Sequence, residues 1–180
     1  MITREELERA RERAREYLRR ACIVLTPQES ANIEVADFGL GELDKTGLEI
    51  VTYVNTARCC AKELVMFPRQ TCPEHMHPPV EGEPGKEETF RCRWGVVYLY
   101  LPGEPTPNRA CSPPPAPDGA YTVFREVVLH PGEQYTLPPH TLHWFQAGPD
   151  GAIVSEFSTT SRDELDIFTD KRIARVPVVS

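Results

Sequence analysis

The chain has 180 residues, of which 40% are hydrophobic and 26% charged, and its formal net charge is −7. This length and balance predict one soluble globular domain that buries a sizeable core without disulfide bonds. The negative charge argues against nucleic acid or an anionic membrane as the main partner. The sequence contains no apolar run long enough to span a membrane and no apolar secretory segment near its start, so we expect a cytoplasmic protein.

The first predicted element is a helix over residues 1–22. Thr3 and Glu6 have the spacing of a capping box. Apolar residues then recur every three or four positions from Leu7 to Ala21, with charged residues between them. The resulting apolar face is narrow, and it could pack on the domain itself or on a partner subunit.

Short strands are predicted from residue 46 onward. They are GLEIVTYVNT, CCAKELVMFP, TFRCRWGVVYLYLP, YTVFREVVLHPG, QYTLPP, HTLHWFQAG and GAIVSEFSTT, with Pro, Gly and Asp turn signals between them. Such a series favours an all-β sandwich or barrel over alternating strands and helices. We therefore expect a single domain over residues 1–180, with the helix at 1–22, a β-barrel core at 46–160 and a C-terminal tail at 161–180.

The stretch PGEPTPNRACSPPPAP, residues 102–117, is rich in proline. Proline removes a backbone donor, so this stretch cannot form a central strand or a helix. Similar strand patterns flank it, which predicts a surface excursion between two strands and not a domain linker. The six cysteines form no CxxC pair, and we expect reduced, mostly buried thiols.

A histidine pair in TCPEHMHPP is the first candidate for metal binding. On a strand, the side chains of His75 and His77 point to the same face. Such pairs are often only surface polar residues, so the pair alone is weak support. The Pro- and Gly-rich loop of residues 78–87 can bring the next strand back beside the first, with Glu88 on it and Gly95 at a sheet bend.

A second segment, PGEQYTLPPHTLHWFQAG, supplies another histidine. Gly132, Pro138 and His143 have a spacing that can place His143 opposite the histidine-pair strand in a barrel. Three imidazoles and one carboxylate leave two positions open on an octahedral divalent ion, as in a catalytic site. The expected metal ligands are His75, His77, Glu88 and His143.

Both segments resemble the paired motifs of the cupin superfamily, G-x5-HxH-x3,4-E-x6-G and G-x5-PxG-x2-H-x3-N. The chain departs from them in three places. The gap between His77 and Glu88 is ten residues, His140 stands where the second motif has Gly, and Ala147 stands where it has Asn. The resemblance implies a cupin-type double-stranded β-helix, a jelly-roll barrel, with an N-terminal α-helix.

A closer resemblance, to the D-lyxose ketol-isomerase family, covers nearly the whole chain. It rests on GLEIVTYVNTARCCAKELVMFPRQTCPEHMHPP, GKEETFRCRWGVVYLYL, PPHTLHWFQAG and STTSRDELDIFTDKRI. It implies an aldose–ketose isomerase that interconverts D-lyxose and D-xylulose, and also D-mannose and D-fructose, through a metal-stabilised cis-enediolate. It further implies Mn2+ as cofactor, a monosaccharide as the small-molecule partner, and a homodimer.

The isomerase reaction needs a general base outside the ligand set. Glu156, on the last predicted strand, is our hypothesis for this base. Asp166 lies in the tail, which could fold over the barrel mouth, and Lys62 could donate to a sugar oxygen or stabilise the enediolate. For each of the three, a solvated or ion-paired residue is the alternative interpretation. Glu74 and Glu87 neighbour ligands by one residue, so strand alternation turns them to the opposite face.

Two other functions remain open at this point. A site with three histidines and one glutamate also suits iron and O₂, as in a cupin dioxygenase. A cupin that binds a sugar without turning it over would use similar residues.

Overall fold

The computed structural model describes residues 2–176, which fold mostly into β-strands. The helices are α1 (Arg4–Arg20), α2 (Pro27–Ala31) and the 3₁₀ helix η1 (Asp163–Leu165). The strands are β1 (Glu34–Ala36), β2 (Leu48–Asn55), β3 (Cys60–Met66), β4 (Thr71–Met76), β5 (Glu88–Leu101), β6 (Arg125–Leu129), β7 (Gln134–Leu137), β8 (His143–Ser158) and β9 (Ile167–Phe168).

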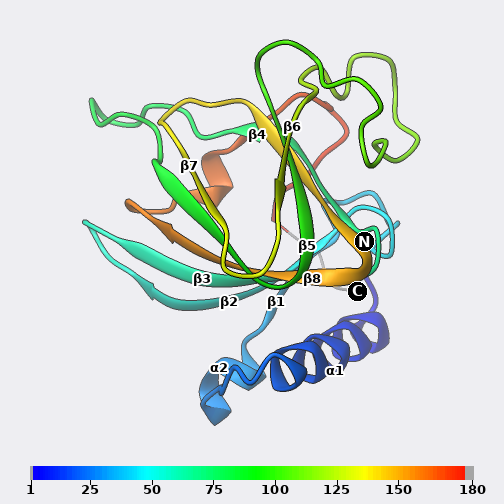
Figure 1. The fold of residues 1–180 in the computed structure, drawn as a ribbon. Helices are drawn as coiled ribbons and strands as arrows, with labels where there is room; N and C mark the ends of the chain where they lie inside the picture. Colours follow the sequence, from blue (N-terminus) through cyan, green and yellow to red (C-terminus); the bar gives the residue numbers. More distant parts are fainter. Residues whose placement is uncertain (1, 177–180) are drawn as a thin grey trace.

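All the strands pair antiparallel in one sheet that curls into a barrel (Figure 1). Along one path the order is β1-β2-β3-β8-β4-β9, and β5 pairs with β6, β7 and β8. The first part of β8 pairs with β4 and its second part with β3, while β5 follows both parts. The predicted all-β, cupin-type architecture with an N-terminal helix is confirmed.

The two long strands turn the corner of the barrel where glycines meet. Gly95 on β5 has a φ of +70°, and a Cβ there would lie 2.1 Å from the carbonyl oxygen of Gly151 on β8. Only glycine permits this approach and this conformation, so the expected role of Gly95 at a bend is confirmed. The expectation of two strands at 140–148 and 151–160 is wrong, because β8 is continuous and the Gly-Pro-Asp-Gly signal marks its bend.

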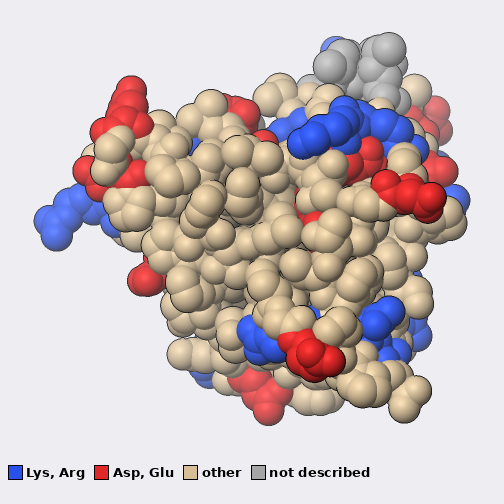
Figure 2. Space-filling model, turned by 90° about the horizontal axis from the view of Figure 1, so that it is seen from above, with Lys and Arg blue, Asp and Glu red and all other residues tan. Residues whose placement is uncertain are grey.

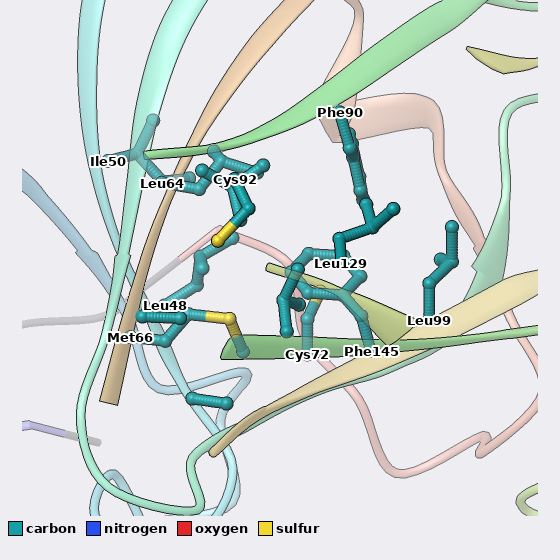
Figure 3. Packing of buried hydrophobic residues seen from close by; sticks show 14 of the residues in the cluster. Leu48, Ile50, Leu64, Met66, Cys72, Phe90, Cys92, Leu99, Leu129 and Phe145 are labelled. Atoms are coloured by element: carbon teal, nitrogen blue, oxygen red, sulfur yellow. The ribbon is translucent and has the colours of Figure 1, made fainter. Parts of the chain in front are cut away.

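The barrel interior is apolar except at one end. Inward-facing residues of several strands form the main core, among them Leu48, Ile50, Leu64, Phe90 and Phe145. These side chains converge on the space that the curled sheet encloses (Figure 3). Alternation points every second side chain of a strand into the barrel, and burial of each apolar side chain contributes about 1.5–3 kcal/mol. This packed layer closes the inner end of any site built at the barrel mouth.

Helix α1 lies against the outside of the sheet (Figure 1). Both hydrogen bonds of the Thr3–Glu6 capping box are present, as predicted. The buried residues of the helix are Ala10, Ala14, Tyr17 and Leu18, and they pack with Val51, Val65 and Ile153 of the sheet. The apolar face of α1 is therefore used within the domain and is not left for a partner subunit.

Two irregular segments complete the molecule. No strand occurs between β5 and β6, so residues 102–124 are the surface excursion that the prolines predict. The tail runs back over the barrel and pairs with β4 through β9. On the face that Figure 2 shows, Lys and Arg lie near the rim in small groups with Asp and Glu beside them. None of the described helices is long and apolar enough to cross a membrane.

All six cysteines are free thiols. Cys60, Cys72 and Cys92 are buried, Cys111 is half-buried, and Cys22 and Cys59 are exposed. Half of the thiols are thus buried in the fold, against the expectation that most would be.

Candidate metal centre and active site

Three histidines meet at the open end of the barrel. His75 lies on β4, His77 directly follows that strand, and His143 begins β8, where it is the register partner of His75. Their candidate ligand nitrogens all lie within 4.8 Å of one another, and all three side chains are buried. The spacing of two along β4 and the pairing of β4 with β8 bring them together.

Each imidazole is held by its Nδ1. Nδ1 of His75 lies 2.8 Å from the carbonyl oxygen of Pro73, and Nδ1 of His143 lies 2.9 Å from that of Thr141. A carbonyl oxygen only accepts, so in both rings Nδ1 donates and a neutral ring presents the lone pair of Nε2. Nδ1 of His77 donates to Oδ1 of Asp166 at 2.5 Å. Such partners fix the orientation and the tautomer of metal-binding histidines.

Glu88 points to the same place from β5. Its Oε1 lies 3.1 Å from Nε2 of both His77 and His143. Nε2 of His143 is nevertheless without a hydrogen-bond partner among the described residues. The two groups are therefore close together, but their orientation does not make a hydrogen bond. A divalent cation would satisfy both groups, so the donor set fits the predicted metal.

The strand that carries Glu88 is not placed as expected relative to the histidines. The loop of residues 78–87 does not place β5 beside β4, because β8 lies between these strands and pairs with both. Glu88 therefore approaches from two strands away, across the curved inner surface. The Glu88 carboxylate meets the imidazoles of His75 and His77 because the sheet curls, not because β4 and β5 are neighbours.

The pKa values of the buried groups follow from burial and from their charged neighbours. Burial and the two neighbouring imidazoles hold the pKa of His75 well below its usual range. Burial also acts to lower the pKa of His77, but Glu88 and Asp166 raise it to about 9. Burial acts to raise the pKa of Glu88, but Lys86 and His77 hold it well below its usual range. A proton on His77 thus balances the Glu88 carboxylate that a cation would otherwise neutralise.

A buried lysine, Lys86, links the ligand Glu88 to the predicted base Glu156. Its Nζ lies 2.9 Å from Oε2 of Glu88 and 3.0 Å from Oε1 of Glu156. Ser158 also donates to Glu156 Oε1, at 3.1 Å. Burial acts to lower the pKa of Lys86, but Glu156 and Glu88 raise it well above the usual value, so the lysine is charged. The sequence interpretation missed Lys86, because this residue lies in the loop before β5, where strand alternation does not apply.

Lys62 belongs to a second group of charges, centred on Asp163 of the tail. Its Nζ donates to Oδ2 of Asp163 at 2.6 Å and to Oγ of Ser161 at 2.8 Å. Arg175 also donates to Asp163, at 3.1 Å, and its other terminal nitrogen lies 2.5 Å from Oε1 of Glu34. No local pattern indicated Asp163 or Arg175, because both lie in an irregular segment whose path depends on tertiary contacts.

The predicted site residues line one small cavity of about 30 Å³. Its polar wall contains His75, His77, Lys62, Lys86, Glu88, Glu156, Asp163, Asp166 and Arg175, and His143 adjoins it through Glu88. Its inner wall is apolar and includes Phe90, Phe145 and Phe168. This volume holds only about two water-sized groups. The cavity therefore has room for a cation and a few oxygen atoms.

The other acidic residues of the motif region face elsewhere. Glu74 is buried and accepts hydrogen bonds from Thr122, from the backbone of Val123 and from Thr169. It thereby ties both irregular segments to the histidine strand. Glu87 is exposed. The departure at His140 is a turn position with a φ of +63°, which explains why the general motif has Gly there.

The fold and the site together define a class. A cupin-type barrel with three inward histidines and a glutamate, next to a buried Lys–Glu pair, is the architecture of a cupin-like sugar isomerase. Solved L-ribose isomerases share the fold. The enzyme of Acinetobacter sp. DL28, solved with L-ribose, superposes with a TM-score of 0.82 at 16% identity, over 99% of this chain and 98% of that one. The enzyme of Cellulomonas parahominis, solved with L-ribose, gives 0.73 at 17% identity, over 99% and 98% of the two chains.

Sequence comparison identifies the family. A protein-family profile described as D-lyxose isomerase matches residues 118–180. The D-lyxose ketol-isomerase of Cohnella laeviribosi is 63% identical over 97% of this chain and 96% of its own. The D-lyxose/D-mannose isomerase of Thermosediminibacter oceani is 60% identical over 99% of both chains. The chain belongs to the D-lyxose isomerase family and is an enzyme of the isomerase class.

Proposed function

We propose that this enzyme interconverts D-lyxose and D-xylulose, and D-mannose and D-fructose, with a divalent ion held by His75, His77, Glu88 and His143. Two similar proteins are named for D-lyxose, and one of these also for D-mannose. We propose manganese as the ion, following the family resemblance, since imidazole and carboxylate ligands suit several divalent metals.

One observation carries the proposal. Nε2 of His143 has no hydrogen-bond partner among the described residues although Oε1 of Glu88 lies 3.1 Å away, and both groups lie beside a buried Lys86–Glu156 pair. The contact between His143 and Glu88 favours a bound cation. The Lys86–Glu156 pair places an ammonium group and a carboxylate beside that cation, where they can transfer protons.

When bound, a divalent ion would polarise the sugar carbonyl and stabilise the negative charge that develops on the oxygens at C1 and C2. Glu156 accepts the proton from C2 of the open-chain aldose and returns it to C1, while the oxygen at C1 gains a proton and the hydroxyl at C2 loses one. Lys86 holds Oε1 of Glu156 at 3.0 Å, so the carboxylate keeps one position during both transfers.

We propose different roles for Lys62 and Asp166. Lys62 stands opposite Glu156 in the register of β3 and β8, and its ammonium group can donate to a sugar oxygen once Asp163 moves aside. Asp166 accepts from Nδ1 of His77 and so acts as a positioning residue for that ligand. The buried apolar wall of the cavity keeps water from the reacting carbons.

The direct test is to supply manganese, offer D-lyxose and D-mannose, and measure ketose formation and deuterium uptake from solvent at C1 of the ketose. We expect both ketoses. If no pentose or hexose gives a ketose, the proposal is wrong.

Variants separate the metal site from the base. His77→Ala and His143→Ala should lose both bound metal and activity. Glu156→Gln should keep the metal and lose roughly 10²- to 10⁴-fold in kcat. Glu87→Gln, at an exposed neighbour of a ligand, is the control and should change neither. A fully active Glu156→Gln enzyme would rule out Glu156 as the base.

Family membership favours this reaction over a cupin dioxygenase or a sugar-binding cupin without activity. Oxygen consumption with an organic substrate would support the dioxygenase. Saturable sugar binding without product would support the binding protein.

We further propose that the enzyme works in the cytoplasm as a homodimer, as the family resemblance implies. Light scattering after size exclusion measures the mass of the particle. A monomer at micromolar concentration would contradict the dimer.

A further inference from the structure

The cavity at the metal ligands is too small for a whole sugar. Its volume of about 30 Å³ takes the reacting oxygens and little more, whereas sites that enclose small molecules span about 300–1,000 Å³. The apolar core closes its inner end at Leu48, Ile50 and Leu64. The rest of a bound sugar must therefore extend outward, past the tail.

Two pockets adjoin the cavity at the tail. One has a volume of about 20 Å³ and shares His77, Lys86 and Asp166 with the cavity. The other, which we call the vestibule, has a volume of about 350 Å³ and shares Lys62, Asp163 and Arg175 with it. Its remaining lining residues are Glu34, Thr52, Asn55, Ser161, Glu164 and Val176. Of these two exits, only the vestibule has the space for a sugar chain.

The partition between cavity and vestibule consists of ion pairs. Asp163 bridges Lys62 and Arg175, with distances of 2.6 and 3.1 Å, and Arg175 also pairs with Glu34. Burial acts to raise the pKa of Asp163, but the surrounding cations hold it well below its usual range, so the carboxylate is charged. Hydroxyl groups of a polyol chain can replace such contacts one by one, as donors to carboxylates and acceptors from Lys and Arg.

We propose that the vestibule is the subsite for the distal, hydroxyl-bearing end of the open-chain sugar, and that Thr52 at its wall sets the preference between pentoses and hexoses. This inference rests on the proposed function. C1 and C2 must lie at the metal ligands and Glu156. A hexose is one carbon longer than a pentose and reaches one carbon further into the vestibule.

Thr52 is suited to this role by its place on β2. It is the register partner of Lys62, so it lies one strand away at the rim of the same inner surface. Its side chain is exposed, and a larger residue there would fill the vestibule without entering the core. Val54 is also exposed on β2 but lines neither the cavity nor the vestibule, which makes it a matched control.

The test compares kcat/KM for D-mannose and D-lyxose in the wild type, Thr52→Phe, Thr52→Gln and Val54→Phe, all loaded with manganese. Filling the vestibule should lower the mannose-to-lyxose ratio of kcat/KM about tenfold in Thr52→Phe, mainly through KM, and less in Thr52→Gln. Val54→Phe should keep the wild-type ratio. Circular dichroism and thermal unfolding check that each variant folds, and Thr52→Gln serves if Thr52→Phe does not.

Two outcomes would overturn the inference. Either the ratio stays at the wild-type value in a folded Thr52 variant, or Val54→Phe lowers it as much as Thr52→Phe does. A wild type that makes no ketose from any sugar would instead defeat the proposed function itself. The two failures are thus distinguishable.

Discussion

At the scale of single residues, Glu49 is a buried carboxyl outside the catalytic cavity. It lies on β2, and its Oε1 accepts from Gln70 at 3.2 Å while Oε2 has no hydrogen-bond partner among the described residues. Burial raises its pKa from 4.5 to about 8. The folded protein therefore holds this carboxyl neutral at neutral pH.

Replacing this residue should change how stability depends on pH. Between pH 4.5 and 8 the folded state keeps a proton that the unfolded state has released, so the free energy of unfolding falls as pH rises. The slope is at most about 1.4 kcal/mol per pH unit. Glu49→Gln should remove this slope: its unfolding free energy should match the wild type near pH 4.5 and exceed it at pH 8. Urea unfolding across this range measures the difference. Parallel curves for the two proteins would contradict the prediction.

His140 offers a second residue-scale prediction. Its φ of +63° disfavours any residue with a Cβ, and its side chain is exposed. The left-handed conformation costs roughly 1–2 kcal/mol, part of which glycine returns as entropy of the unfolded chain. His140→Gly should therefore raise the free energy of unfolding by about 1 kcal/mol. Denaturant unfolding measures this free energy. A decrease in the variant would show that the His140 imidazole makes a stabilising contact.

At the scale of elements, the loop of residues 78–87 supports the metal ligand that precedes it. Gly85 packs against His77 so closely that a Cβ would lie 2.1 Å from the His77 carbonyl oxygen. Gly82, in the same loop, has a φ of +86° but open space around it. One glycine is thus required by contact and the other by backbone conformation.

These two glycines should respond differently to alanine. Gly85→Ala should displace the backbone of His77 and weaken manganese binding by about tenfold or more, because a ligand shift of a few tenths of an ångström disturbs the site. Gly82→Ala should cost about 1 kcal/mol of stability and leave manganese affinity unchanged. Isothermal titration with manganese and thermal unfolding separate the two effects. Equal manganese affinities in both variants would show that the loop does not hold His77.

At the scale of the whole molecule, the proposed ligands connect distant parts of the chain. They lie on or directly after β4 and on β5 and β8, while Asp166 brings in the tail. A bound ion would therefore stabilise the barrel mouth as a unit. An ion that binds only the folded state at 100 times its dissociation constant adds about 2.7 kcal/mol.

Metal removal should accordingly lower the melting temperature. For a domain of this size we expect a loss of roughly 5–10 °C on chelation, restored by manganese. His143→Ala should melt at the same temperature with and without manganese. Calorimetric scans of both proteins provide the measurement. If chelation does not change the melting temperature of the wild type, the proposal that the ligands join three strands is wrong.

The sequence was informative where a local pattern decides the structure. The Thr3–Glu6 box and the apolar period define α1, because a helix end and face depend on residues a few positions apart. The alternation in GLEIVTYVNT corresponds to β2 at Leu48–Asn55. Helix α2 also carries a local signal, a capping box of Thr26 and Glu29 with Pro27 at its start, which the prediction missed, whereas η1 and β9 had no such signal. The loop signal at Gly148–Gly151 was misread because turn residues also mark bends within a strand.

Some residues of the candidate site could be predicted from local patterns, and others could not. His75, His77, Glu88 and His143 could be named from spacing and family resemblance, whereas Lys86 lies in the loop before β5 and had no such signal. Asp163 and Arg175 could not be predicted either, since their place depends on where an irregular tail packs. The function of Asp166 as a support for His77 likewise appears only when the tail lies against the barrel.

By itself, the sequence determined the helix, most of the strands, the ligand types and the family, because propensity, periodicity and motif spacing act over short distances along the chain. Only the tertiary structure decided that β8 separates β4 from β5, that Lys86 joins Glu88 to Glu156, and that a vestibule lies beyond Asp163. These features join residues far apart in sequence. They arise from the curl of the sheet and the docking of the tail, which no local pattern encodes.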